Sequence, residues 1–136
     1  MSVYHWPVRV YYEDTDAGGV VYYANYLKFM ERARSEWLRA LGVEQDLLRA
    51  ETGALLMVHS LNLRYVSPAR FNQQLSVTVE VNQLGRAKVN FRQCVMCDDV
   101  LLCQGEVTIA CVNEKSGKPM AFPTQLKDAF QGVLVR

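Results

Sequence analysis

Three carboxylates and two glycines stand close together near the start of the chain. Glu13, Asp14 and Asp16 are followed by Gly18 and Gly19, and a helical pattern begins a few residues later. The first amides of a helix lack intrahelical partners, so they can polarise a carbonyl and hold developing negative charge. A carboxylate just upstream can act as a nucleophile or as a base for water, and glycine allows an acyl group to approach closely. Thioester hydrolysis needs these parts and no cofactor.

The same segment allows two other interpretations. An acidic loop before a helix is common, because carboxylates cap the helix and balance its dipole. The spacing of Asp14, Asp16 and Gly19 also resembles the start of an EF-hand loop. That loop requires an acidic or amide side chain where this chain has Gly18, and Glu where it has Asn25. We therefore expect no metal site, and a helix-capping loop remains the structural alternative.

The element after this segment is the clearest helix in the sequence, over residues 24–41. Asn25 is a candidate N-cap, and Gly42 is a natural stop. A shorter helix is expected over residues 44–50. The apolar positions of the long helix recur at steps of three and four, which is typical of one buried face; they are Tyr26, Phe29, Met30, Ala33, Trp37, Leu38 and Leu41.

Strands account for most of the remaining chain. Strands that follow one another through tight turns pair antiparallel, and the long helix must bury its apolar face against their sheet. One helix leaves edges of the sheet open, so we expect dimerisation through a sheet edge or the bare face. The predicted class is α+β, in one domain over residues 1–136. The expected strands span residues 7–12, 55–66, 75–81, 89–96 and 101–112, with a last helical turn near 126–130.

Composition argues against several classes of protein. Half of the 136 residues are hydrophobic, 21% are charged and the formal net charge is +1. The sequence has no basic block for nucleic acid and no apolar run long enough to span a membrane. The first residues have neither the basic nor the apolar part of a signal peptide, so we expect a cytoplasmic protein.

Four cysteines raise the question of metal or redox chemistry. Cys94 and Cys97 form a C-x-x-C pair. The pair lies within a strand-like run, and neither a second pair nor a nearby His completes a zinc set. We interpret the cysteines as small, buried apolar residues in a reducing compartment, with no metal and no cofactor.

The sequence around Asp16 also carries a family resemblance. Residues 6–22 read WPVRVYYEDTDAGGVVY, followed by Asn25-Tyr26 and by ERAR at 31–34. This run resembles the signature of the hot-dog thioesterases of the 4-hydroxybenzoyl-CoA thioesterase type, and it is especially similar to the Tol-Pal-associated acyl-CoA thioesterase branch. The resemblance continues more weakly through residues 65–71 and the later strands. It implies a hot-dog fold, in which a curved antiparallel sheet wraps one long helix.

The resemblance also implies roles for individual residues. It makes Asp16 the catalytic carboxylate, and it implies that the backbone N–H near Tyr23 binds the thioester carbonyl. Tyr12 is a lesser candidate, as a hydroxyl lining the same cleft. The Tol-Pal-associated branch usually carries His at the position of Tyr23, whereas Tyr stands there in the 4-hydroxybenzoyl branch and contributes its main-chain N–H. In this family the site lies between subunits, so the resemblance implies a homodimer or homotetramer.

Substrate contacts are less sharply defined by the sequence. Gly19 is the expected point of close approach for the substrate. Arg and Lys suit the phosphates of CoA, and of several candidates we favour Arg86 and Lys88, which lie at a predicted turn. The other candidates are Arg64, Arg70 and Arg92.

Two hypotheses of different classes follow. In the first, the chain is an enzyme that hydrolyses an acyl-CoA to the free acid and CoA. In the second, it is a non-catalytic hot-dog module that binds acyl-CoA or acyl-carrier protein in an envelope-associated complex, a hypothesis that the Tyr23 departure keeps open. The carboxylate of Asp16 argues against the second, because a pure binder gains little from a negative charge beside an anionic ligand. A dehydratase of the same fold would require a His at the site.

Overall fold

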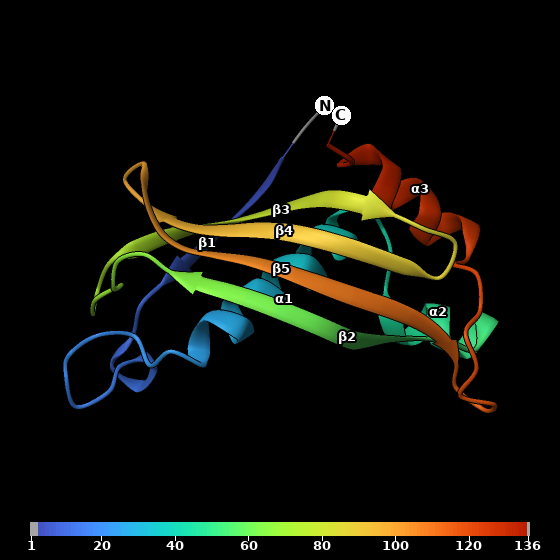
Figure 1. Ribbon diagram of the computed structural model, residues 1–136, viewed down its shortest axis with the longest axis horizontal. Helices are drawn as coiled ribbons and strands as arrows, with labels where there is room; N and C mark the ends of the chain where they lie inside the picture. The colour runs from blue at the N-terminus through green and yellow to red at the C-terminus, as the bar shows by residue number, and fades with distance from the viewer. Residues whose placement is uncertain (1–2, 136) are drawn as a thin grey trace.

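A computed structural model describes residues 3–135. The chain forms one curved five-stranded sheet around a long helix (Figure 1). The order of elements agrees with the order expected from the sequence. The elements are β1 (Tyr4–Arg9), the 3-10 turn η1 (Tyr12–Asp14), α1 (Asn25–Ala40), α2 (Gln45–Thr52), β2 (Ala54–Tyr65), β3 (Gln74–Leu84), β4 (Lys88–Cys97), β5 (Val100–Asn113) and α3 (Thr124–Gly132).

The sheet has the order β1-β3-β4-β5-β2, and every neighbouring pair is antiparallel. β1 and β2 are therefore its two edges. The first strand begins at Tyr4 rather than at Pro7, because Tyr4 pairs with Val79 of β3. Pro7 is tolerated within it since an edge strand has one side without ladder partners. The tight turn between β4 and β5 is built on Asp98 and Asp99, whose φ angles of 47° and 66° suit a hairpin.

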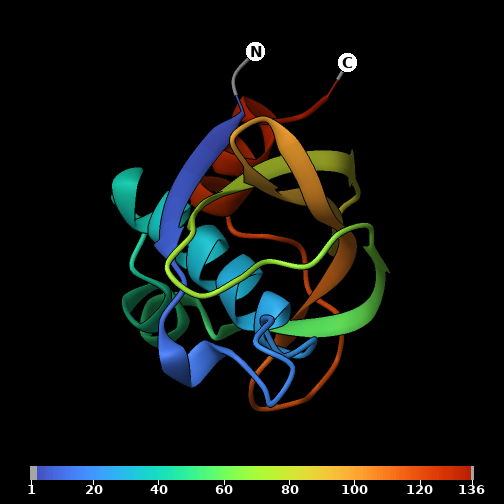
Figure 2. The same cartoon turned by 90° about the vertical axis from the view of Figure 1, so that its left-hand side faces the viewer.

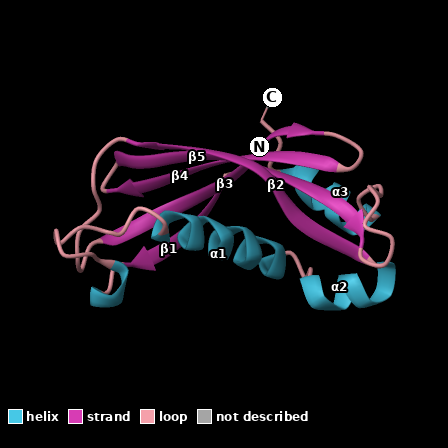
Figure 3. Cartoon of the chain, turned by 60° about the horizontal axis from the view of Figure 1, so that its bottom comes forward, coloured by secondary structure: helices cyan, strands magenta, loops and turns pink. Residues whose placement is uncertain are grey.

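The long helix lies in the concavity of the sheet (Figure 2). α1 runs along the sheet and α2 continues beyond its end (Figure 3). The predicted apolar face is buried from Tyr26 to Leu38. Leu41 is an exception, being 54% exposed, because the helix ends at Ala40 and Leu41 is its C-cap. Gly42, with φ +83°, allows the chain to turn away as expected.

The C-terminal helix α3 and an aromatic cluster close one end of the core. α3 is longer than the predicted turn, and its Phe130 packs edge-on against Phe91 and Phe122 and beside Trp37. Cys103 and Cys111 are buried as predicted, whereas Cys94 and Cys97 are only half-buried. None of the helices between residues 3 and 135 is long and apolar enough to cross a membrane.

Candidate active site

A tight loop between β1 and α1 presents the Asp16 carboxylate. Thr15 and Val21 form an isolated antiparallel bridge, and within it the Asp16 N–H donates to the Val20 carbonyl at 2.9 Å. The turn closes with the Gly19 N–H bonded to the Asp16 carbonyl at 3.0 Å. Gly19 has φ +76°, which glycine adopts without the clash that a Cβ causes. The loop is thus fixed by its own backbone.

Within this loop, Asp14 and Asp16 have different surroundings. The Asp14 carboxylate accepts the Tyr11 N–H at 2.8 Å, so it is engaged in holding the η1 turn. The Asp16 side chain is exposed, and its Oδ1 accepts the Gly18 N–H at 2.8 Å. This bond orients the carboxylate, and Oδ2 has no protein donor among residues 3–135. Asp16 is therefore the carboxylate that is free to react.

The start of α1 is anchored to the same loop. The Tyr22 N–H and the Asn25 side-chain amide both donate to the Asp14 carbonyl at 2.9 Å. The prediction of Asn25 as N-cap was wrong: Ala24 occupies that place, and the Asn25 side chain reaches back to the loop. No acceptor within the described chain pairs with the Tyr23 or Ala24 amide. The helix thus begins with amides that remain available.

Asp16 and Tyr23 line one pocket of about 340 Å³ at this end of the molecule. Its walls come from three segments: the loop, the beginning of α1 and the end of β2. The remaining lining residues are Val20, Val21, Tyr26, Tyr65, Val66, Ser67 and Pro68. The pocket therefore joins a carboxylate, helix-start amides and an apolar wall.

Two tyrosine phenols near the pocket, those of Tyr22 and Tyr65, have raised pKa values. A side-chain hydrogen bond with Tyr23 is the main cause of a raised pKa for the Tyr22 phenol, and the charge of Asp16 adds to it. Burial is the main cause of a raised pKa for Tyr65. Both phenols therefore keep their protons at neutral pH, and the Tyr65 proton is donated to the Tyr23 carbonyl.

The other catalytic and substrate-binding candidates near the loop lie in different settings. Tyr12 stacks on Phe71, with ring centroids 3.8 Å apart and planes 7° from parallel, and it does not line the pocket. A Cβ built at Gly19 would meet no atom within 4 Å, so the space beside this glycine is open. The role of Tyr12 in catalysis and that of Gly19 in binding remain predictions.

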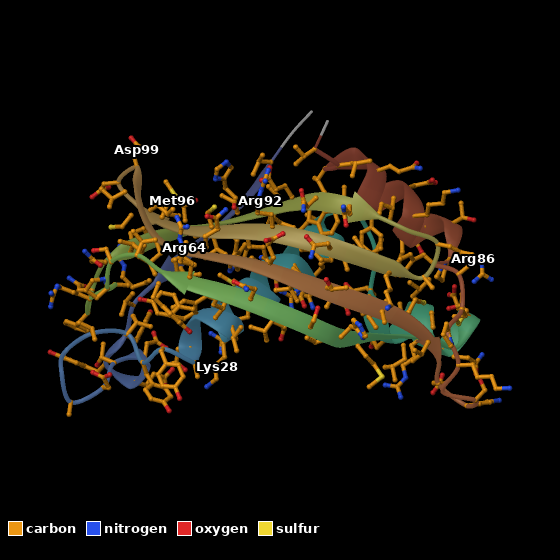
Figure 4. All side chains as sticks on the ribbon, in the orientation of Figure 1. Lys28, Arg64, Arg86, Arg92, Met96 and Asp99 are labelled. Atoms are coloured by element: carbon orange, nitrogen blue, oxygen red, sulfur yellow. The ribbon has the colours of Figure 1, made fainter. Side chains whose placement is uncertain are left out.

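Arg86 and Lys88 do not line this pocket within the chain. Figure 4 shows Arg86 at the end of the molecule opposite to the loop, and Arg64 at the loop's end. Lys88 begins β4 beside the same turn as Arg86, with its Nζ 3.5 Å from the His59 ring. Arg70 is closer to the site, because it bridges to Val20 of the pocket wall. Among the arginines named from the sequence, Arg64 and Arg70 are thus better placed for this pocket.

Sequence reasoning missed Tyr65 as a site residue. Its hydroxyl donates to the Tyr23 carbonyl at 2.9 Å, across 42 positions of sequence. No local motif signals this contact, because it depends on how β2 ends beside α1. No cluster of three or more His, Cys, Asp or Glu residues that could hold a metal occurs in the described part of the chain.

Comparisons with known proteins agree on one family. The profile of the Thioesterase-like superfamily matches residues 10–130. An acyl-CoA thioesterase, YbgC from Haemophilus influenzae, is 44% identical over 127 residues, 93% of each chain. The acyl-CoA thioester hydrolase YbgC from Escherichia coli O6:H1 is 40% identical over 131 residues, 96% of this chain and 97% of the relative. The crystal structure of a probable thioesterase from Bartonella henselae superimposes with a TM-score of 0.83 at 33% identity, covering 90% of this chain and all of that one.

Proposed function

Because the chain belongs to the Thioesterase-like superfamily, we propose that it hydrolyses acyl-CoA thioesters in the pocket around Asp16. It is a thioester hydrolase with the hot-dog fold, and acyl-CoA is its substrate class, as in relatives 40–44% identical over most of the chain. The observation that carries the assignment of the site is the pairing, in one pocket, of the Asp16 carboxylate with the start of α1. The carboxylate is exposed and the Tyr23 amide has no acceptor within the described chain.

The proposed reaction uses these two groups in turn. The Tyr23 N–H binds the thioester carbonyl oxygen and stabilises the negative charge that develops on it. Asp16 either attacks the carbonyl carbon, forming a mixed anhydride that water then hydrolyses, or takes a proton from the attacking water. In both routes the C–S bond breaks, CoA leaves as the thiolate and is protonated, and the free acid is released.

The proposal includes a homodimer in which a second copy pairs along β2. This strand is an edge of the sheet, and it exposes apolar side chains, including Met57, Val58 and Leu61. An unpaired edge of twelve residues is a template for another strand. Since β2 ends at Tyr65 on the pocket wall, the partner would complete the site. A dimer or a tetramer by light scattering would support this arrangement, and a monomer would contradict it.

The location of the enzyme, its second thioester carrier and its association are proposed as the sequence led us to expect. We place the enzyme in the cytoplasm, with acyl-carrier protein as a second thioester carrier and with an association with the Tol-Pal envelope system. The competing hypothesis is a non-catalytic hot-dog module in an envelope-associated complex. It predicts binding of acyl-CoA or acyl-carrier protein without release of thiol, so the same assay separates the two.

The test is release of free CoA thiol from a panel of short, long and aromatic acyl-CoAs, with acyl-carrier protein thioesters alongside. Asp16→Asn should lower turnover about 100- to 10,000-fold, the range for loss of a general acid or base. Glu13→Gln is the matched control, because it neutralises an exposed carboxylate three residues away. Binding without turnover in the native protein would favour the binding module, and an active Asp16→Asn variant would exclude this carboxylate.

A further inference from the structure

Tyr65 contacts the start of α1 from a different part of the fold. It is the last residue of β2, at the edge of the sheet, and it lines the Asp16 pocket. Its ring lies edge-on to Tyr23, with centroids 6.5 Å apart, and edge-on to Tyr26 at 5.5 Å. Tyr26 is itself held, because its hydroxyl accepts the Ala69 N–H at 3.1 Å. The Tyr65 side chain is thus fixed between two aromatic rings.

The hydroxyl of Tyr65 satisfies a carbonyl that the helix leaves unpaired. In a regular helix the Leu27 N–H would bond to the Tyr23 carbonyl. Here the Leu27 N–H bonds to the Ala24 carbonyl instead, at 3.2 Å. No other backbone amide in the described chain donates to the Tyr23 carbonyl. The Tyr65 hydroxyl, at 2.9 Å, is its donor.

This bond fixes the backbone on one side of Tyr23, and a second bond fixes the other side. The Asn25 N–H donates to the Tyr22 carbonyl at 2.8 Å, and that carbonyl shares a peptide plane with the Tyr23 N–H. The Tyr23 carbonyl shares the next plane with the Ala24 N–H. Because a trans peptide is planar and its C=O and N–H point in opposite directions, holding each carbonyl sets the direction of each amide. Both amides lack an acceptor among residues 3–135.

We infer that Tyr65 is a positioning residue, which holds the Tyr23–Ala24 peptide so that the helix-start amides meet the thioester oxygen. The inference rests on the proposed function and deepens it. Tyr65 itself touches the backbone of Tyr23 and is not the group that reacts. Its action resembles that of other groups that fix catalytic donors before the transition state forms. It also makes the end of β2, and with it the sheet edge, part of the catalytic apparatus.

The first test is Tyr65→Phe, which removes the hydroxyl and keeps the ring contacts. Loss of alignment of an oxyanion donor should lower kcat by roughly 10- to 100-fold. KM should stay within about twofold, because the effect falls on the transition state rather than on substrate binding. Tyr4→Phe, which deletes the hydroxyl of a half-buried tyrosine in β1, is the matched control and should leave both constants unchanged. A kcat within twofold of the native value would overturn the inference.

The second test does not depend on turnover. The order parameters of the Tyr23 and Ala24 amides, measured by NMR relaxation, should be near the value of about 0.85 for rigid backbone in the native protein. In Tyr65→Phe the Ala24 amide should fall toward about 0.6, the upper limit for flexible backbone, while the Tyr23 amide keeps its bond-fixed plane through the Tyr22 carbonyl. An unchanged Ala24 amide would overturn the positioning role even if kcat fell. If the native chain released no thiol from any substrate, the proposed function would fail, while this measurement would still decide the role of Tyr65.

Discussion

Two polar clusters, one in the loop before α1 and one along the helix, differ in how many of their hydrogen-bonding groups are paired. At the start of the helix, the Asp16 carboxylate is exposed and has one protein donor. Further along, Arg34 donates to the Gln93 side chain at 2.7 Å, and Gln93 is fully buried. The Gln93 amide in turn donates to the Met30 carbonyl at 3.0 Å and to the Thr78 carbonyl at 3.2 Å. The first cluster leaves groups available to substrate, and the second satisfies its own.

The Arg34 guanidinium carries a charge that only its neighbours in the fold hold in place. Burial lowers the pKa of Arg34 to about 10, which leaves it cationic at neutral pH. Its guanidinium lies 6.0 Å from the centre of the Phe91 ring, and no carboxylate in the described chain forms an ion pair with it. A half-buried charge held by an amide and an aromatic ring depends on both contacts. The contrast leads us to expect that the Arg34–Gln93 cluster stabilises the fold, whereas the Asp16 pocket is the proposed site of chemistry.

Gln93→Leu should have the largest effect on stability, and it breaks the buried cluster directly. It leaves the Arg34 guanidinium without its acceptor and removes the side-chain hydrogen bonds to the Met30 and Thr78 carbonyls. We expect a loss of roughly 2–4 kcal/mol in the free energy of unfolding, measured by urea titration. The double variant with Arg34→Met should be less destabilised than Gln93→Leu alone, because the unpaired charge is gone. A loss below about 0.5 kcal/mol, the usual range for surface changes, would show that the cluster is not a stabilising unit.

Gly105→Ala probes the tightly packed wall between α1 and the sheet. A Cβ at this buried glycine would stand 2.7 Å from the Leu63 side chain and 3.0 Å from the Met30 sulfur. Overpacking of this kind costs about 1–3 kcal/mol. The melting temperature should fall, while turnover per folded molecule at a lower temperature should be retained. A stability equal to that of the native protein would mean that this wall yields easily.

Gly19→Ala is the corresponding change at the proposed active site, and it should affect turnover more than stability, the opposite of Gly105→Ala. A Cβ there meets open space, so the only cost to stability is the left-handed backbone, about 1–2 kcal/mol. The shift of this turn should reduce kcat more than stability, because the same turn presents Asp16. Steady-state kinetics and urea titration on the same sample would check this. Equal turnover in Gly19→Ala and the native enzyme would mean that the geometry of this turn does not influence catalysis.

Cys103 gives the smallest effect, as a pH dependence of the core. Burial, with a lesser contribution from Cys94, raises the pKa of its thiol to about 11. In the unfolded chain the thiol ionises near 9, so between pH 9 and 11 the folded state binds more protons. The free energy of unfolding should then fall with rising pH across that window. Cys103→Ala should lack this pH dependence. If the free energy of unfolding fell equally steeply with pH in both proteins, the dependence would not come from the Cys103 thiol.

The sequence predicted the framework of the fold well, and for physical reasons. The apolar period of α1 and the alternation in β3 and β4 arise from one-sided burial, so the pattern alone marks these elements. Leu41 was misassigned because periodicity does not reveal the residue at which a helix ends. Asn25 was misassigned because its acceptor, the Asp14 carbonyl, is set by the folded loop.

The candidate site was only partly predictable. Asp16 and Tyr23 lie in one short motif, and the structure brings them to one pocket. Tyr65 could not be found from the sequence, because its contact spans 42 positions and depends on the end of an edge strand. The preference for Arg86 and Lys88 came from their place at a turn, and a turn position does not indicate at which end of the sheet it lies.

The most direct test is a crystal structure with a ketone analogue of acyl-CoA, in which a methylene replaces the thioester sulfur. We expect the ketone oxygen about 2.7–3.1 Å from the Tyr23 amide nitrogen, the range for an oxyanion donor. The carbonyl carbon should face the Asp16 carboxylate at about 3–3.5 Å, or be separated from it by one water. A ketone bound away from the start of α1, for example beside Arg34, would contradict the assignment of the active site.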